Sequence, residues 1–122
     1  MKILLVDDDN TTRRALLLGL KKIGYEPDEV SHPIDALKKV DVISYDLIIV
    51  DFNMSLISGG NLIKLLNKSN NKTPVLILSS ESRIKIESSG VDINSVWIIS
   101  KDQPITAILE KINTYLKKQI FN

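Results

Sequence analysis

The sequence predicts an α/β fold, a three-layer sandwich in which a five-stranded parallel sheet carries helices on both faces. Short runs of large aliphatic residues, such as Ile3–Val6 and Leu47–Val50, have the composition of strands that are buried on both faces. These runs alternate with segments whose apolar residues recur at helical spacing, which is typical of βα units joined by right-handed crossovers. The length of 122 residues, 43% of them hydrophobic, fits a single domain over residues 1–122 with a substantial core.

The first strand and the first helix have clear boundaries. We expect the strand over residues 2–6 and the helix over residues 11–23. Asp9 or Asn10 is a suitable N-cap, because a short polar side chain there accepts a hydrogen bond from an unpaired helix amide. Gly24 follows the last apolar residue of the helix, which is where a glycine commonly ends one.

The next segment predicts an edge strand, a short helix and a central strand. Residues 26–31 are polar for a strand, which suits an edge of the sheet. Pro33 begins the helix, since a proline is tolerated at the first helical position. We expect its apolar residues to face the sheet: Ile34, Leu37 and Val40. The third strand is expected over residues 46–51.

A glycine-containing loop and a polar turn surround the third helix. Ser58-Gly59-Gly60 leads into this helix, and residues 67–73 form the turn that follows it. Its apolar residues are Leu62, Leu65 and Leu66. The fourth strand is expected over residues 74–78.

The last third of the chain holds its least regular and its most regular segments. Residues 82–95 are expected to contain a short helix before Gly90, and residues 96–99 the fifth strand. Pro104 opens the last helix, which has the clearest apolar stripe in the chain. The stripe consists of Ile105, Ile108, Leu109, Ile112 and Leu116.

Composition excludes several classes of function. The net charge is +1, from 16 basic and 15 acidic residues, so nucleic acid is not an expected partner of this domain. The chain has no cysteine and one histidine, which argues against disulfides and against zinc sites. No segment has the length of a membrane span or of a signal peptide, so we expect a soluble, cytoplasmic domain without membrane contact.

Two of the apolar runs end in aspartates. Val6 is followed by Asp7-Asp8-Asp9, and Val50 is followed by Asp51. In an open α/β sheet, ligands bind beyond the carboxyl ends of the strands, so these carboxylates lie where such a fold keeps its active site. Two simpler interpretations exist: acidic residues favour the start of a helix, and a single aspartate can start a turn.

Clustered carboxylates predict a bound cation. Two carboxylates about 5 Å apart repel each other by about 3 kcal/mol at an effective dielectric constant of about 20. A divalent cation would remove this cost, and oxygen ligands without histidine or cysteine favour magnesium or manganese over zinc. Ser79 and Lys101 follow the fourth and fifth strands and add a hydroxyl and an ammonium group at the same edge. A cation and a lysine can neutralise a phosphoryl group while a carboxylate acts as the nucleophile.

Taken together, these residues resemble the receiver domain of two-component response regulators, of which the single-domain chemotaxis regulator is the simplest type. The resemblance covers nearly the whole chain. It rests on Leu5–Asp9, on Ile49–Met54 with Gly59 behind it, on Pro74–Ser79 and on Lys101. It implies a flavodoxin-like sheet with strand order 2-1-3-4-5, and a signalling domain that is not an enzyme.

The resemblance also implies a role for each site residue. Asp51 would be the phosphoacceptor, and Asp7, Asp8 and Asp51 would hold Mg²⁺ with the backbone carbonyl of Asn53. Lys101 would contact the phosphoryl oxygens, and Ser79 would bind the phosphorylated aspartate in the switching step. Transfer of this kind depends on positioning and on charge neutralisation.

The chain departs from the family pattern in several places. Ser80 stands where a small alanine is usual, and Asp102 replaces the proline that usually follows the lysine. In the family the peptide bond before that proline is typically cis. A cis bond before a residue other than proline costs about 3 kcal/mol, so we expect a trans Lys101–Asp102 bond. Ile98 occupies the position of the aromatic switch residue, with Trp97 beside it on the opposite side of the strand.

The segment from Gly90 to Lys101 is longer than is usual for the family, and whether the Gly90–Asp102 region still switches on phosphorylation is open. The implied partners are a histidine kinase or a phosphotransfer protein and, downstream, a protein partner or an output domain of a longer chain; formation of a homodimer is also open. One alternative function is that of a pseudo-receiver, an interaction module that works without phosphorylation. A phosphatase with an aspartyl intermediate is disfavoured, because Asn53 stands where such enzymes carry a second acid.

Overall fold

Five parallel strands form the central sheet in a computed structural model that describes residues 1–54, 58–69 and 71–121. The strands are Lys2–Val6 (β1), Glu26–Val30 (β2), Leu47–Asp51 (β3), Val75–Ser79 (β4) and Trp97–Ser100 (β5). Their order across the sheet is β2-β1-β3-β4-β5, which confirms the predicted topology and the edge position of β2. The strand ends are aligned, since Val6 pairs with Val50, Asp51 with Leu78, and Ser79 with Ser100.

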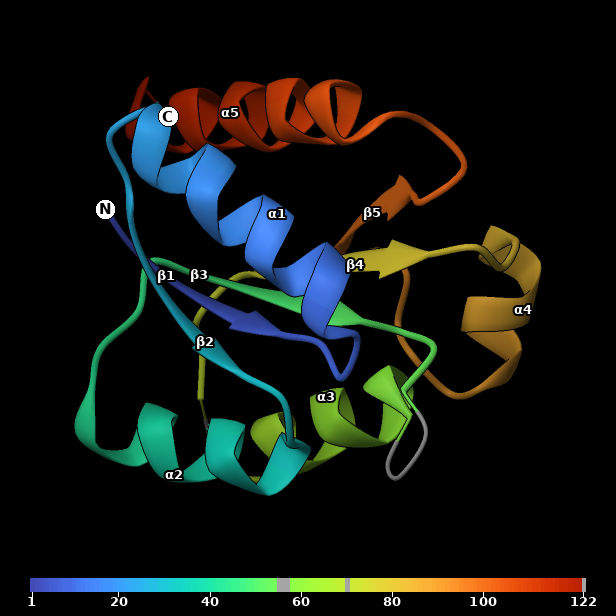
Figure 1. Ribbon diagram of the computed structural model, residues 1–122. Coiled ribbons are helices and arrows are strands. Elements are labelled where there is room, and N and C mark those ends of the chain that lie inside the picture. Colours follow the sequence, from blue (N-terminus) through green and yellow to red (C-terminus); the bar gives the residue numbers. More distant parts are fainter. Residues whose placement is uncertain (55–57, 70, 122) are drawn as a thin grey trace.

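Five helices alternate with the strands and make the outer layers (Figure 1). They are Asn10–Lys22 (α1), Pro33–Val42 (α2), Gly59–Lys68 (α3), Arg83–Ser88 (α4) and Ile105–Phe121 (α5). Helices α1 and α5 cover one face of the sheet, and α2 and α3 cover the other. The short α4 lies beyond the end of β4, so it covers little of the sheet.

The core is divided by the sheet. On the α1 and α5 side, thirteen buried residues form one cluster, among them Leu16, Leu20, Ile108 and Ile112. The other side of the sheet has two clusters. One of them packs α2 and α3 against β1 and β3. A smaller cluster includes Ile86 of α4 and Val91, with Ile93 and Val96 packed against it. The segment between α4 and β5 thus supplies part of the core on this side of the sheet.

The predicted boundaries of α1 are confirmed to within one residue. Asp9 is the N-cap, and its carboxylate accepts hydrogen bonds from the amide of Thr11 and the hydroxyl of Thr12. The Thr12 hydroxyl is the main reason why the pKa of Asp9 lies below its usual value. Gly24 follows the helix with a φ of 100°, a left-handed conformation that favours glycine.

The prediction that Ile34 faces the sheet is wrong. Its side chain is 48% exposed, whereas Pro33 and Ala36 are buried. Helix α2 begins at Pro33, as expected, but its inner face consists of Pro33, Ala36, Leu37 and Val40, so Ile34 lies at the border of that face. Leu37 and Val40 do pack against the core as expected.

The remaining differences are small. Helix α3 continues to Lys68, so Asn67 and Lys68 are helical and do not belong to the turn. Strands β4 and β5 each begin one residue later than expected, at Val75 and Trp97. The helix expected before Gly90 is present as α4.

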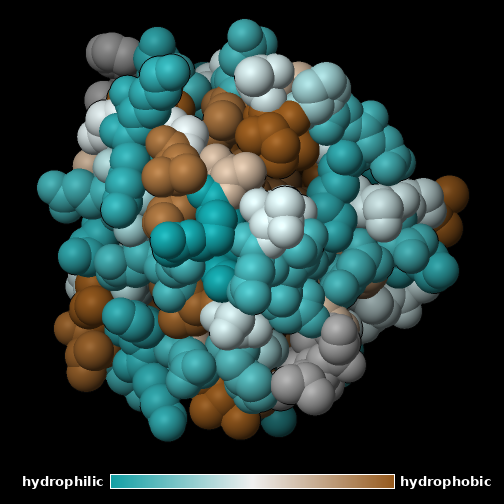
Figure 2. Space-filling model, viewed as in Figure 1, coloured by the Kyte–Doolittle hydropathy of each residue, from teal (hydrophilic) through white to brown (hydrophobic). Residues whose placement is uncertain are grey.

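Apolar side chains on the surface are scattered. Among the residues whose burial the structure describes, the large ones that are clearly exposed are Leu18, Ile23, Ile34, Val42, Leu65 and Ile84. Figure 2 shows hydrophobic residues as separate small patches within a mostly hydrophilic face. Isolated apolar side chains of this kind are normal on a protein surface and do not by themselves define a binding site.

Candidate functional site

The predicted site residues lie at one edge of the sheet. All five strand arrows point the same way in Figure 1, so the loops after the strands lie together. Asp7 directly follows β1, Asp51 is the last residue of β3, and Ser79 is the last residue of β4. Lys101 directly follows β5, and its amide donates a hydrogen bond to the carbonyl of Ser79 at 2.9 Å.

Three carboxylates form a compact group at this edge. One oxygen each of Asp7, Asp8 and Asp51, here called the acidic triad, lies within 4.8 Å of the others. Asp7 and Asp51 are buried, with 4% and 3% of their surface exposed. Burial, more than any other influence, raises the pKa of Asp7 to about 7, and the neighbouring charge of Asp51 acts in the same direction. The triad is therefore poised to bind positive charge.

Lys101 provides one positive charge directly. Its Nζ lies 2.6 Å from Oδ1 of Asp51, which makes a charge-assisted hydrogen bond. The same oxygen accepts a hydrogen bond from the backbone amide of Asn53 at 3.1 Å. The Asp51 carboxylate is thus held in a defined orientation at the end of a buried central strand.

Ser79 and Asn53 lie at the site but contact other groups. The buried Ser79 hydroxyl accepts a hydrogen bond from the amide of Glu81 at 2.8 Å. The Asn53 side chain is exposed, and its Oδ1 accepts hydrogen bonds from the amide and the hydroxyl of Ser80, at 3.4 and 3.3 Å. The loops after β3 and β4 are therefore bridged by Ser80, one of the residues at which the chain departs from the family pattern.

Gly59 approaches the backbone beside Asp51. A Cβ atom at Gly59 would lie 2.7 Å from the carbonyl oxygen of Asp51 and 2.7 Å from the Cα of Phe52. The Gly59 amide also donates a hydrogen bond to the carbonyl of Phe52 at 3.1 Å. Glycine at this position allows the start of α3 to lie directly against the strand end that carries Asp51.

The Lys101–Asp102 peptide bond is trans, as predicted. With that bond, Lys101 still reaches Asp51, so the substitution of the family's proline does not turn the lysine away from the acidic triad. The two neighbouring residues of β5 do face opposite sides of the sheet. Trp97 stacks on Tyr115 of α5 with ring centroids 4.9 Å apart, whereas Ile98 packs against the cluster that contains Ile86.

Sequence reasoning did not identify Arg13 as part of this region. Arg13 is buried on α1, and its Nη1 donates a hydrogen bond to the carbonyl oxygen of Asp7 at 2.7 Å. A signal for it exists in the sequence. Arg13 has helical spacing with Leu16, Leu17 and Leu20, so an arginine occupies a position on the apolar stripe of α1.

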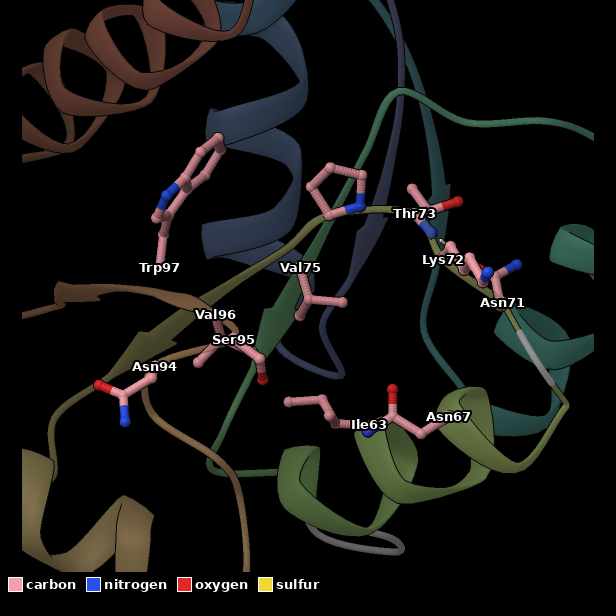
Figure 3. A pocket seen from close by; sticks show the side chains of 11 residues that line it. Ile63, Asn67, Asn71, Lys72, Thr73, Val75, Asn94, Ser95, Val96 and Trp97 are labelled. Carbon is pink, nitrogen blue, oxygen red and sulfur yellow. Dashed lines mark hydrogen bonds between the residues drawn. The ribbon is translucent and has the colours of Figure 1, made fainter.

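The opposite edge of the sheet holds a separate pocket of about 470 Å³ (Figure 3). Its walls come from the end of α3, the segment before β4 and the segment before β5, and include Asn67, Lys72, Asn94 and Trp97. None of the predicted site residues lines it. The acidic triad and this pocket are thus separate features at the two ends of the strands.

The triad has the chemistry of a site for a hard divalent cation. Its ligands are carboxylate oxygens from Asp7, Asp8 and Asp51, with no sulfur or imidazole among the group. The cost of keeping Asp7 ionised next to Asp51 would be relieved by such an ion.

None of the described helices combines the length and the apolar composition needed to span a membrane.

Comparisons with known proteins agree with this geometry. Residues 3–113 match the family model described as the response regulator receiver domain. The receiver domain of the Francisella response regulator 1452 is 28% identical, with a TM-score of 0.79 over 97% of this chain and 98% of that one. The response regulator protein TrrA from Thermotoga maritima, in complex with Mg(2+)-BeF, is 30% identical, with a TM-score of 0.75 over 93% of this chain and 96% of that one.

Two curated proteins are similar over nearly all of this chain but extend well beyond the matched part. The transcriptional regulatory protein PcoR of Escherichia coli is 28% identical over 117 residues, which are 96% of this chain and 52% of PcoR. The sensor protein EvgS of Escherichia coli is 30% identical over 118 residues, which are 97% of this chain and 10% of EvgS. The chain thus spans about half the length of PcoR and about a tenth of EvgS.

The fold, the acidic triad at the strand ends and the family match lead to one conclusion. The acidic triad is of the kind typical of phosphoaccepting response regulators. Receiver domains are signalling modules and not enzymes in the ordinary sense. The chain belongs to the family of response regulator receiver domains, the signal-receiving components of two-component systems.

Proposed function

We propose that Asp51 accepts a phosphoryl group from a histidine kinase or a phosphotransfer protein, and that this changes the binding of a partner. One observation carries the proposal. The Asp51 carboxylate is buried at the end of a central strand, 2.6 Å from the Lys101 ammonium and within 4.8 Å of two further carboxylates. A nucleophilic carboxylate beside positive charge suits attack on phosphorus, after which the imidazole of the donor leaves.

The proposed cofactor is Mg²⁺, held by Asp7, Asp8 and Asp51, with the backbone carbonyl of Asn53 as a further ligand. The oxygen-only donor set supports this choice. So does the structure of TrrA, which is in complex with Mg(2+)-BeF. When bound, the ion would neutralise negative charge on the phosphoryl oxygens and on the triad.

Lys101 and Ser79 have separate roles in the proposal. Lys101 would move from Asp51 to a phosphoryl oxygen, a short shift for an ammonium group that already touches the acceptor. Ser79 would turn its hydroxyl hydrogen, which it donates to the Glu81 carbonyl at 3.5 Å, to a phosphoryl oxygen. Because that change alters the contact between Ser79 and the loop after β4, it connects the chemistry at Asp51 to α4.

The proposed partners act before and after the receiver domain. A histidine kinase follows from membership of two-component systems, and the similarity to a part of the sensor protein EvgS is consistent with it. PcoR is a transcriptional regulatory protein and about twice as long as the matched segment. We therefore propose that residues 1–122 form one receiver domain, which acts in the cytoplasm on a separate protein or on an output domain.

Intact-mass measurement tests the phosphoacceptor. The protein is incubated with Mg²⁺ and a small phosphodonor, and we expect one added phosphoryl group on the wild type and none on Asp51→Asn. Asp41→Asn, an exposed change on α2, is the matched control and should still give the adduct. Absence of the adduct on the wild type, under conditions that modify other receiver domains, would support the pseudo-receiver alternative in its place.

A further inference from the structure

Arg13 is a buried arginine on the otherwise apolar inner face of α1. It is 7% exposed and shares that face with Leu16, Leu17 and Leu20. A buried guanidinium group is costly unless its charge and its donors are satisfied. Its hydrogen-bond partners therefore indicate what the residue contributes.

The Arg13 guanidinium connects three parts of the structure. Nη1 donates to the carbonyl oxygen of Asp7 at 2.7 Å, beyond the end of β1. Nη2 donates to Oδ1 of Asn10 at 2.6 Å, at the start of α1. Nε donates to Oε1 of Glu29 at 3.3 Å, on the edge strand β2. One side chain thus connects the loop of the acidic triad to the start of α1 and to the edge strand β2.

The Asp7 carbonyl needs such a donor because the strand pairing stops there. The registers of β1 with β2 and with β3 both end at Val6. The Asp7 amide still donates to the carbonyl of Val30, whereas the Asp7 carbonyl accepts from Arg13. Within β1, the neighbouring strands donate hydrogen bonds to the backbone carbonyls. At the end of the strand, Arg13 is the donor to the Asp7 carbonyl.

The carbonyl held by Arg13 belongs to the peptide unit that joins Asp7 to Asp8. That unit is planar, so fixing its oxygen restricts the orientation of the Cα atoms on both sides. Both residues contribute carboxylates to the triad, together with Asp51. The hydrogen bond from Arg13 thus acts on the peptide unit that joins two of the three residues of the triad.

We propose that Arg13 is a positioning residue of the acidic site, that it sets the Mg²⁺ affinity through the Asp7–Asp8 peptide unit, and that Glu29 acts on the site only through Arg13. The inference rests on the proposed function of the triad as a Mg²⁺ site. Residues that orient metal ligands typically change metal affinity by about 10- to 100-fold when they are replaced.

Arg14 provides a matched control. It is the neighbouring residue on the same helix and also pairs with Glu29, through Nη1 at 3.2 Å. Its side chain is 62% exposed, and none of its hydrogen bonds among the described residues reaches the acidic triad. Replacing Arg14 therefore removes an arginine and a Glu29 contact but leaves the Asp7 carbonyl bonded.

The experiment measures the dissociation constant of Mg²⁺ by calorimetry, at a temperature where each variant is folded as judged by circular dichroism. We expect Arg13→Gln to raise the constant about 10-fold and Arg14→Gln to leave it unchanged. Arg13→Lys keeps the charge but cannot bridge three acceptors, so an intermediate value is expected, and this variant serves if Arg13→Gln does not fold. Leu17→Ala, another buried position of α1, separates general destabilisation from positioning and should bind Mg²⁺ like the wild type.

A double-mutant cycle tests the part played by Glu29. Glu29→Gln should raise the dissociation constant by about 2- to 3-fold in the wild type and have no effect in Arg13→Gln, because coupled residues are not additive. Equal Mg²⁺ affinity of Arg13→Gln and the wild type would overturn the positioning role and leave the proposed function intact. A wild type that binds no Mg²⁺ would overturn both.

Discussion

The two edges of the sheet differ in how their polar groups are held. At the carboxyl edge, Asp7, Asp51 and Ser79 are buried, and each has a specific hydrogen-bond partner. At the amino edge, the pocket is lined by exposed groups such as Asn67 and Asn94 and by no acidic side chain. Like charges are thus concentrated at one end of the strands and absent from the lining of the other.

This difference shows where the fold gives up stability. Bringing carboxylates together out of water costs free energy that apolar packing must offset. No acidic side chain lines the pocket at the amino edge, so substitutions of its lining residues involve no such cost. Substitutions at the carboxyl edge should therefore change phosphoryl transfer and the pH dependence of stability. Substitutions at the amino edge should change packing alone.

The largest expected effect comes from Lys101. Lys101→Gln removes the ammonium group that lies 2.6 Å from Asp51, and we expect phosphoryl adduct formation to slow by about 100-fold. We also expect unfolding free energy to fall by about 2 kcal/mol, since the buried carboxylate loses its partner. The control is Lys85→Gln, which breaks the exposed ion pair with Glu81. A control effect as large as that of Lys101→Gln would contradict the contrast between buried and exposed charge.

Gly59 gives the next largest effect. Gly59→Ala places a Cβ against backbone atoms of Asp51 and Phe52, which cannot move aside as a flexible side chain would. We expect a loss of about 1–3 kcal/mol in unfolding free energy and slower adduct formation. Chemical denaturation and intact mass measure the two quantities. At Gly19, by comparison, the added Cβ would meet only the end of the Leu109 side chain, so Gly19→Ala should slow the chemistry little.

Asp7 tests whether acidity at the carboxyl edge reduces stability. Because burial raises the pKa of Asp7 from 3.8 to about 7, the folded protein holds a proton that the unfolded chain releases. Without metal, stability should therefore fall as the pH rises from about 4 to about 7. Asp7→Asn should be more stable than the wild type by about 2 kcal/mol at pH 8, and equally stable at pH 3.

Urea denaturation with a chelator present measures this difference at each pH. Added Mg²⁺ should reduce it or reverse its sign, because only the wild type keeps the full triad. If Asp7→Asn is less stable than the wild type at pH 8 without metal, burial of the ionised Asp7 carboxylate does not lower the free energy of unfolding.

Trp97 is expected to show the smallest effect. It is the only tryptophan in the chain and stacks on Tyr115, away from the acidic triad. Its fluorescence maximum should therefore not shift when Mg²⁺ or the phosphodonor is added, with Asp51→Asn as the reference. A shift that follows adduct formation would show that the aromatic side chain responds to the site and would remove the contrast between the edges.

The strands and the triad could be predicted from sequence because each depends on short-range patterns. A buried parallel strand is a run of aliphatic residues, and Asp7, Asp8 and Asp51 follow directly at such strand ends. The topology then brings them together without further information. The inner face of α2 was misassigned at Ile34, because Pro33 and Ala36 are the buried residues beside Leu37 and Val40, and Ile34 is left exposed.

Other features depend on contacts between distant segments. The Asn53–Ser80 bridge joins residues 27 positions apart, and the Arg13–Glu29 contact joins two different elements. A side-chain hydrogen bond of this kind is determined by tertiary geometry and leaves no periodic pattern. Likewise, the Ser79 hydroxyl could be placed at the site from sequence, but its partner, the Glu81 amide, could not.

The two edge strands, β2 and β5, differ in their protection against unwanted association. Strand β2 carries three acidic residues and Pro27, which has no amide hydrogen to offer to another chain. Strand β5 is Trp97-Ile98-Ile99-Ser100, without a charge or a proline. Aggregation or strand exchange through the sheet should therefore begin at β5, whose four residues offer neither of these protections against pairing with a second copy.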